Sequence, residues 1–209
     1  MKLDNKRTIL TGFAFLSICA FWQMYNSIVP LILTNTFHLN ETYSGAIMAA
    51  DNVLALFLLP LFGAISDKTH TKIGKRMPFI LFGTGLAIIL MTLLPLIDNS
   101  YAAAPTTFKT VSFVVVLGLL LVAMGTYRSP AVALMPDITP KPLRAKANGI
   151  VNIMGYIGGA FATVLGLFLV LSSYINAPDH ERNLWVIELP FIIASVLMVI
   201  SALVLFATI

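Results

Sequence analysis

Six long apolar runs divide the 209 residues, and only short polar connections separate them. Because an α-helix rises 1.5 Å per residue, about 20 apolar residues cross the hydrocarbon core of a bilayer. The runs therefore predict an all-α membrane protein with six transmembrane helices, at about 9–36, 42–66, 79–97, 110–135, 146–173 and 186–209. Since the connections are short, we expect neighbouring helices to pack antiparallel in a single bundle that covers residues 1–209.

The composition agrees with a lipid bilayer as the surroundings of this chain. Hydrophobic residues make up 58% and charged residues 11%, and the mean hydropathy is +0.92. That leaves too few polar groups to cover a water-soluble globule. The net charge of +4 does not indicate a nucleic-acid partner, because the basic residues lie beside apolar runs rather than among stacking aromatic side chains.

The distribution of basic residues predicts the orientation. Ten of the thirteen lie on the N-terminus and on the second and fourth connections: Lys2, Lys6, Arg7, Lys68, Lys72, Lys75, Arg76, Lys141, Arg144 and Lys146. Only Lys109 and Arg182 lie on the other side, and Arg128 lies within a span. By the positive-inside rule, both termini are expected to be cytoplasmic, in a protein of the plasma (cytoplasmic) membrane.

The residue types that perform catalysis do not occur in a useful pattern. The three histidines lie in connections far apart, at positions 38, 70 and 180, and Cys19 is the single cysteine. Neither a metal-ligand set nor a disulfide framework follows from these positions. We therefore expect no enzyme, no metal and no cofactor.

Two ionisable residues lie inside apolar runs, where a charge is costly and usually faces a cavity or a partner. Asp51, followed by Asn52, is in the second run, and Arg128, preceded by Tyr127, is in the fourth. Their depths differ by about 10–15 Å at 1.5 Å per residue, which is too far for a direct salt bridge. We interpret both as lining a shared aqueous path, with Asp51 as the candidate for binding a coupling cation. Snorkelling of Arg128 to the interface and a structural role for Asp51 remain alternatives.

Further polar and aromatic residues in the spans are candidates for a substrate cavity. A sugar site combines rings that cover apolar C–H faces with amides that bind hydroxyls. The candidates are Trp22, Gln23, Tyr25 and Asn26 in the first run, Asn52 in the second, Tyr127 and Arg128 in the fourth, and Asn152 and Tyr156 in the fifth. Hydrogen bonding between helices is the alternative for the amides. In the fifth run, Gly155 and Gly159 form a Gly-xxx-Gly pair that predicts close approach of another helix.

The second connection contains a recognisable motif, formed by Gly63, Asp67, Lys68, Gly74, Lys75 and Arg76. It resembles the signature loop of the major facilitator superfamily. The longer spacing before Gly74, together with the stretch from Ser129 to Asp137, is similar to the sucrose-proton symporters and the glycoside-pentoside-hexuronide cation symporters. The resemblance implies an N-terminal six-helix half, a cavity lined by the first and fourth spans, and a cytoplasmic gate formed by the motif with Asp137.

The sequence also departs from both branches at their coupling acids. Residues 121–124 contain no acid where sucrose symporters have an Asp, and Val132 stands where they have an Arg. Melibiose-type relatives have Asp residues at the positions of Ala55 and Leu59. Asp51 is then the remaining acid in this half that could bind a cation.

These observations favour a secondary transporter that moves a sugar or glycoside with H⁺ or Na⁺ by alternating access. No basic residue follows the last run, unlike the other cytoplasmic connections. That pattern favours the first half of a longer protein, completed by a second six-helix bundle. A half-size carrier that acts as a homodimer and a truncated or non-transporting assembly protein remain open.

Overall fold

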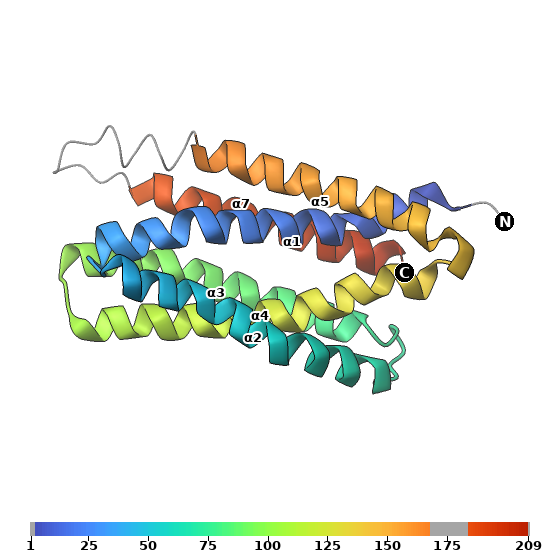
Figure 1. Ribbon diagram of the computed structural model, residues 1–209, viewed down its shortest axis with the longest axis horizontal. Helices are drawn as coiled ribbons and strands as arrows, with labels where there is room; N and C mark the ends of the chain where they lie inside the picture. The colour runs from blue at the N-terminus through green and yellow to red at the C-terminus, as the bar shows by residue number, and fades with distance from the viewer. Residues whose placement is uncertain (1–2, 168–183, 209) are drawn as a thin grey trace.

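The computed structural model describes residues 3–167 and 184–208, and these residues form a bundle of long helices (Figure 1). The helices are α1 (Asn5–Leu31), continued by a π-helical turn η1 (Ile32–Thr36), α2 (Glu41–Lys68), α3 (Met77–Ala103), α4 (Thr107–Ile138), a 3₁₀ turn η2 (Lys141–Leu143), α5 (Arg144–Gly166) and α7 (Leu184–Thr208). Six helices in the described part of the chain are long and apolar enough to cross a membrane. The predicted all-helical class and number of spans are confirmed.

Two predicted connections are shorter than expected. The prediction placed residues 98–109 outside the helices, but α3 continues to Ala103 and α4 begins at Thr107. The reason is a cap: the Lys109 ammonium donates to the carbonyl oxygens of Ser100 and Ala104, at 2.7 and 2.8 Å, so polar residues at the end of α3 stay helical. Likewise α4 continues through Pro136 to Ile138. The predicted end of the fifth span, at residue 173, lies outside the described residues.

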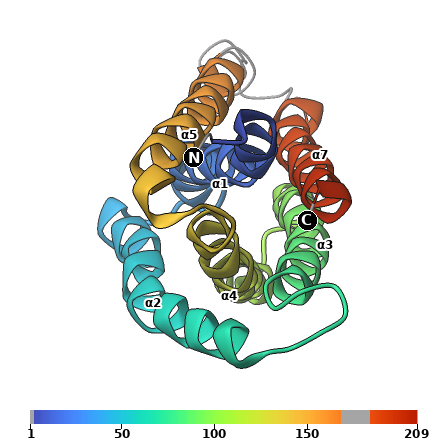
Figure 2. The same ribbon diagram turned by 90° about the vertical axis from the view of Figure 1, so that its right-hand side faces the viewer.

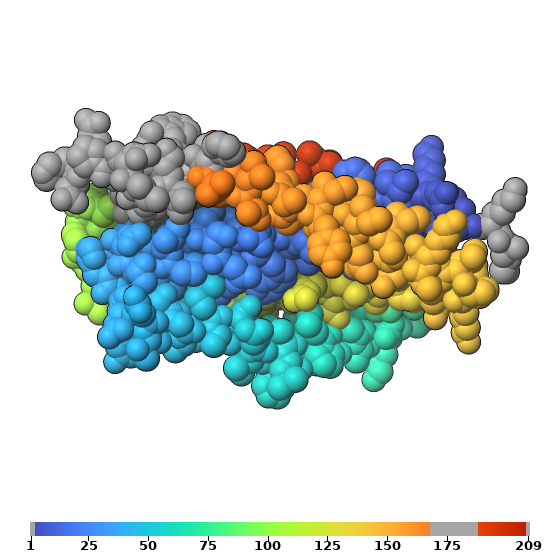
Figure 3. All heavy atoms as spheres, turned by 45° about the horizontal axis from the view of Figure 1, so that its top comes forward, coloured from blue at the N-terminus to red at the C-terminus, as the bar shows by residue number. Residues whose placement is uncertain are grey.

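Figure 2 shows α1 and α4 in the middle of the bundle, between α2 and α5 on one side and α3 and α7 on the other. The core consists of side chains such as Phe21, Ile28, Met91 and Leu117, each at most 1% exposed. In α2, by contrast, no residue of the most apolar stretch is buried. Figure 3 shows the face on which α5 and α2 flank α1. An apolar surface of this extent suits lipid or a further set of helices rather than water.

The close approach of α5 to another helix differs from the prediction in one glycine. A Cβ at Gly158 would lie 2.1 Å from the Leu16 carbonyl oxygen, and one at Gly155 would lie 3.0 Å from the Cys19 sulfur. A Cβ at Gly159 would meet no atom of the described residues within 4 Å. Within the described residues, α5 therefore contacts α1 through Gly155 and Gly158, and the predicted contact at Gly159 is not present there.

Candidate functional site

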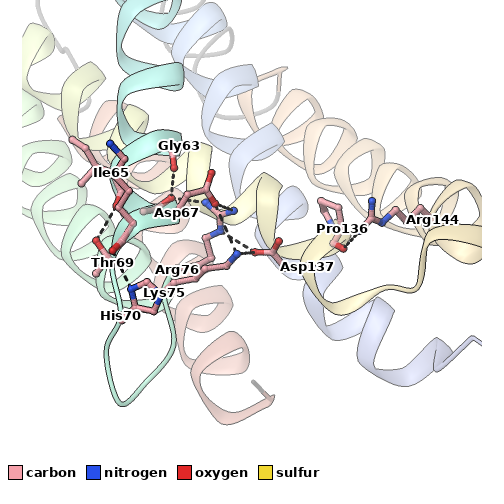
Figure 4. A network of polar contacts seen from close by, with 12 residues as sticks. Gly63, Ile65, Asp67, Thr69, His70, Lys75, Arg76, Pro136, Asp137 and Arg144 are labelled. Atoms are coloured by element: carbon pink, nitrogen blue, oxygen red, sulfur yellow. Dashed lines mark hydrogen bonds and ion pairs between the residues drawn. The ribbon is translucent and has the colours of Figure 1, made fainter.

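A cluster of charged side chains joins α2, α3 and α4 at the end of the bundle where both termini lie (Figures 1 and 4). Arg76 is 6% exposed and is its centre. Its Nε donates to Asp137 Oδ2 at 3.0 Å, and its two terminal nitrogens donate to Asp67 and to the Ser66 hydroxyl. We call this set of Ser66, Asp67, Lys75, Arg76 and Asp137 the Arg76 cluster. It brings together residues 61 positions apart.

The remaining motif residues have separate roles around this cluster. The Lys75 ammonium lies 3.3 Å from Asp137 and 3.9 Å from Asp67, so it adds a second, more exposed cation. Gly74 has φ of +93°, a left-handed conformation that favours glycine. Lys68 is exposed, and no ion pair forms at its side chain among the described residues.

Two residues that the sequence motif did not single out help to build the cluster. Ser66 is fully buried and also donates to the Gly63 carbonyl oxygen at 2.9 Å. Arg144, at the start of α5, donates to the carbonyl oxygens of Pro136 and Thr139 at 2.8 and 3.2 Å. It thereby fixes the end of α4 beside Asp137 (Figure 4). Ser66 could have been found from the sequence because it directly precedes Asp67 of the motif. The role of Arg144 can be seen only in the folded structure.

Nearer the middle of the bundle, Trp22, Asp51 and Arg128 line one narrow groove between α1, α2 and α4. The Arg128 guanidinium carbon lies 5.4 Å from the centre of the Trp22 ring, within the range of a cation–π contact. Apolar side chains, including Leu54 and Leu121, form the rest of the wall. We call this the Asp51–Arg128 groove. It brings the two intramembrane charges of the sequence analysis to one surface without a direct ion pair between the two residues.

Trp22, in the wall of the groove, and Tyr25, packed against Trp22, carry polar groups with no hydrogen-bond partner among the described residues. Tyr25 is 1% exposed, and its ring lies edge-on to Trp22, with ring centres 5.4 Å apart. Within the described residues, the Trp22 indole N–H and the Tyr25 hydroxyl have no hydrogen-bond partner. Since buried polar groups are normally satisfied, such groups beside a groove are candidates for ligand contacts.

The other predicted cavity residues lie in varied positions. Gln23 is partly buried, while Asn26, Asn52, Asn152 and Tyr156 are exposed, and in the described part of the chain none of them lines the Asp51–Arg128 groove. The backbone N–H of Asn52 donates to Asp51 Oδ1 at 2.6 Å. Tyr127 is fully buried, and its hydroxyl lies 2.7 Å from the Ser17 hydroxyl. This hydrogen bond joins α4 to α1.

Ser129 makes a contact between α4 and α2 that the sequence did not predict. Its hydroxyl donates to the Leu59 carbonyl oxygen at 2.7 Å, and a Cβ at Gly63 would lie 3.2 Å from the same hydroxyl. It therefore joins α4 to α2 between the Asp51–Arg128 groove and the Arg76 cluster. The resemblance included the stretch that begins at Ser129, but only the packing shows its partner.

A six-helix membrane bundle with this loop motif defines a class of integral membrane transporters, and comparison with known proteins agrees. The profile of the Major Facilitator Superfamily matches residues 11–209. The chain therefore belongs to the major facilitator superfamily, a family of transporters.

Similar proteins include two with the name sucrose transport protein and one with the name glycoside/cation symporter. The chain is 29% identical over 158 residues to sucrose transport protein SUC3 of Arabidopsis thaliana. This alignment covers 66% of this chain and 26% of the relative. It is 25% identical over 179 residues to sucrose transport protein SUC4 of Arabidopsis thaliana. It is 27% identical over 168 residues to a protein of Escherichia coli (strain K12) that carries the name "Putative glycoside/cation symporter YagG". Each of these alignments covers 78% of this chain and 35% of the relative. The chain thus spans about a quarter to a third of the length of these relatives.

Proposed function

We propose that this chain forms one six-helix half of a secondary transporter that couples the uptake of a sugar or glycoside to a cation, H⁺ or Na⁺. The observation that supports this proposal most is the Asp51–Arg128 groove, where two oppositely charged groups lie at membrane depth without pairing directly. Such groups are costly unless a solute or an ion uses them. The sucrose and glycoside/cation relatives suggest which solute and which coupling partner.

Each charged or aromatic residue in the groove, and Tyr25 beside Trp22, has a proposed role. Asp51 binds the cation, because its carboxylate is the acid in the groove. Trp22 covers an apolar face of the sugar ring, while Arg128 and the Tyr25 hydroxyl bind hydroxyl groups. The remaining polar candidates extend the cavity once a second bundle is in place, and these are Gln23, Asn26, Asn52, Asn152 and Tyr156.

The Arg76 cluster is proposed to act as a gate at the end that holds both termini, which we place in the cytoplasm of a plasma-membrane protein. Its charges are partly exposed, as Asp67 has 57% of its side chain accessible, so a second six-helix bundle can compete for them. A conformational cycle needs contacts that differ between its two states. Ion pairs at the rim of the bundle meet that requirement better than a fully enclosed pair.

The test is the substitution Asp51→Asn in the assembled carrier. We expect accumulation of labelled sugar driven by a proton or sodium gradient to be lost, because the amide cannot take up the cation, while exchange of sugar down its gradient remains. Glu41→Gln, the same acid-to-amide change at the exposed first residue of α2, is the matched control and keeps accumulation. Undiminished accumulation by Asp51→Asn rejects the role of Asp51.

A further inference from the structure

We propose that a cleft between α3 and α7 binds one phospholipid whose head group carries a primary ammonium, and that the Glu188 carboxylate accepts hydrogen bonds from that ammonium. We call this the Glu188 cleft, and its walls include Pro95 and Leu96 of α3 and Glu188, Phe191 and Ile192 of α7. The site shares no wall residue with the Asp51–Arg128 groove and does not depend on the proposed sugar site.

The size and lining of the cleft suit a section of hydrocarbon chain. Its volume is about 60 Å³, whereas pockets that enclose a whole small ligand measure about 300–1,000 Å³. Apart from Thr92 and Glu188, its wall side chains are apolar. Leu96 and Ile192 are 54% and 45% exposed, so the rim of the cleft is open to the surroundings of the bundle. A chain that lies along this rim buries apolar surface against both helices.

The depth of Glu188 suits a lipid head group. Glu188 is the fifth residue of α7, so it lies roughly 6 Å along the helix axis from Leu184, at the end of the bundle opposite both termini (Figure 1). The interfacial layer of a bilayer, which contains the head groups, lies just outside a hydrocarbon core of about 30 Å. Figure 2 shows α3 and α7 on the opposite side of α1 and α4 from α2 and α5. A lipid in the cleft therefore leaves the exposed face of α2 free for another helix.

The carboxylate of Glu188 is held in place but has no cationic partner in the described part of the chain. The side-chain amide of Asn99, on α3, donates a hydrogen bond to Glu188 Oε1. The ion pairs among the described residues all belong to the Arg76 cluster, at the other end of the bundle. A carboxylate beside an apolar cleft is stabilised by a cation that also donates hydrogen bonds, and a lipid ammonium meets both conditions.

The charge and the hydrogen-bonding capacity of the carboxylate select among lipid head groups. An ionised carboxylate has about four lone-pair sites, so several remain after the bond from Asn99. Phosphatidylethanolamine offers an ammonium with three N–H groups. Phosphatidylcholine has the same charges but no N–H group, and phosphatidylglycerol has a net negative charge that Glu188 repels. We therefore commit to phosphatidylethanolamine as the occupant.

The experiment measures lipid binding to the purified protein in detergent by native mass spectrometry. The probes have identical acyl chains and are phosphatidylethanolamine, its N-methyl and N,N-dimethyl derivatives, phosphatidylcholine and phosphatidylglycerol. Because a hydrogen bond to a charged group corresponds to about 10-fold in affinity or more, we expect phosphatidylethanolamine to bind at least about 10-fold more tightly than phosphatidylcholine. The derivatives that retain an N–H group should lie between these two lipids.

Two matched substitutions locate the preference. Glu188→Gln retains an acceptor for the Asn99 amide and removes the charge, so it should bind phosphatidylethanolamine and phosphatidylcholine about equally. Glu41→Gln makes the same change at the exposed first residue of α2 and should keep the preference.

The opposite results overturn the inference in distinguishable ways. Equal binding of phosphatidylethanolamine and phosphatidylcholine to the unaltered protein rejects it, and this comparison stands even if Glu188→Gln fails to fold. A preference that survives Glu188→Gln shows that the ammonium binds elsewhere, and one that Glu41→Gln also removes shows a general effect of surface charge. Tightest binding of phosphatidylglycerol shows that basic residues select the lipid. None of these results bears on the proposed sugar site.

Discussion

Arg76→Leu is the substitution that most directly tests the energetics of the Arg76 cluster. Leucine keeps most of the buried volume, but it removes the donor of three hydrogen bonds and leaves Asp137, with 29% of its side chain exposed, without its closest cation. Breaking a buried ion pair by removing one partner costs about 3–5 kcal/mol. Because both carboxylates keep contact with water and Lys75 stays nearby, we expect the lower end, about 3 kcal/mol.

That loss corresponds to about a 150-fold change in the folding equilibrium, at one decade per 1.4 kcal/mol. If the conversion for soluble domains of this size, about 2–4 °C per kcal/mol, applies in detergent, the unfolding midpoint falls by roughly 6–12 °C. The assay is thermal unfolding of the purified protein in detergent. Lys68→Ala is the control, because this exposed lysine lies outside the cluster, and it should change stability by less than about 0.5 kcal/mol.

A double substitution separates the ion pair from simple loss of packing. Asp137→Asn in the Arg76→Leu background removes the stranded charge, so it should recover part of the lost stability, and the two effects should not add. A midpoint for Arg76→Leu within the range of Lys68→Ala would show that the cluster does not stabilise the bundle. Strictly additive effects would show that Arg76 and Asp137 do not interact.

Three smaller tests of the packing of the bundle use the same thermal assay. Gly158→Ala should lower the stability of the fold by about 1–3 kcal/mol, because the added methyl group meets the backbone of α1. Gly159→Ala should be neutral or slightly stabilising, because that side of α5 is open among the described residues. Equal effects of the two substitutions would contradict the α1–α5 contact. Tyr127→Phe should cost about 1 kcal/mol through loss of the contact with Ser17, and no loss would show that the hydroxyl pair does not stabilise the helices. Gly74→Ala should cost about 1 kcal/mol because its left-handed backbone disfavours any Cβ; an unchanged midpoint would show that the loop relaxes freely.

The sequence predicted the bundle well because the apolar runs are long and the bilayer requires backbone hydrogen bonds to be satisfied within each span. It predicted the ends of α3 and α4 less well, since the Lys109 cap joins residues across a turn. The Gly155 and Gly159 pair shows the same limit. A spacing of four places both glycines near one surface of a helix, but which neighbour α5 meets, and at what rotation, is decided by the packing of α1.

The charged residues of the candidate site could be picked out from the sequence, but the residues that they meet in the fold could not. Asp51 and Arg128 stood out because a charge within an apolar run is costly wherever it lies. Their depths along separate spans predicted no direct salt bridge between them, and the crossing of α2 and α4 brings both residues to one groove without such a pair. Tyr127 was a candidate for the substrate cavity because it precedes Arg128 in the sequence. A helix turns about 100° per residue, so adjacent residues point in different directions, and the Tyr127 hydroxyl meets Ser17 of α1 instead.

Helices α2 and α4 contribute both to the Asp51–Arg128 groove and to the Arg76 cluster. Between groove and cluster, Ser129 bonds the backbone of α2 at Leu59. A Cβ at Gly125 would lie 3.3 Å from the Leu58 side chain, so glycine there lets α4 approach α2 closely. This close contact lies between the Asp51–Arg128 groove on one side and the partly exposed ion pairs of the Arg76 cluster on the other, which is a suitable place for a pivot. The proposed transport cycle requires such an element, because ligand binding in the groove can alter the Arg76 cluster only if the contact between α2 and α4 is stiff.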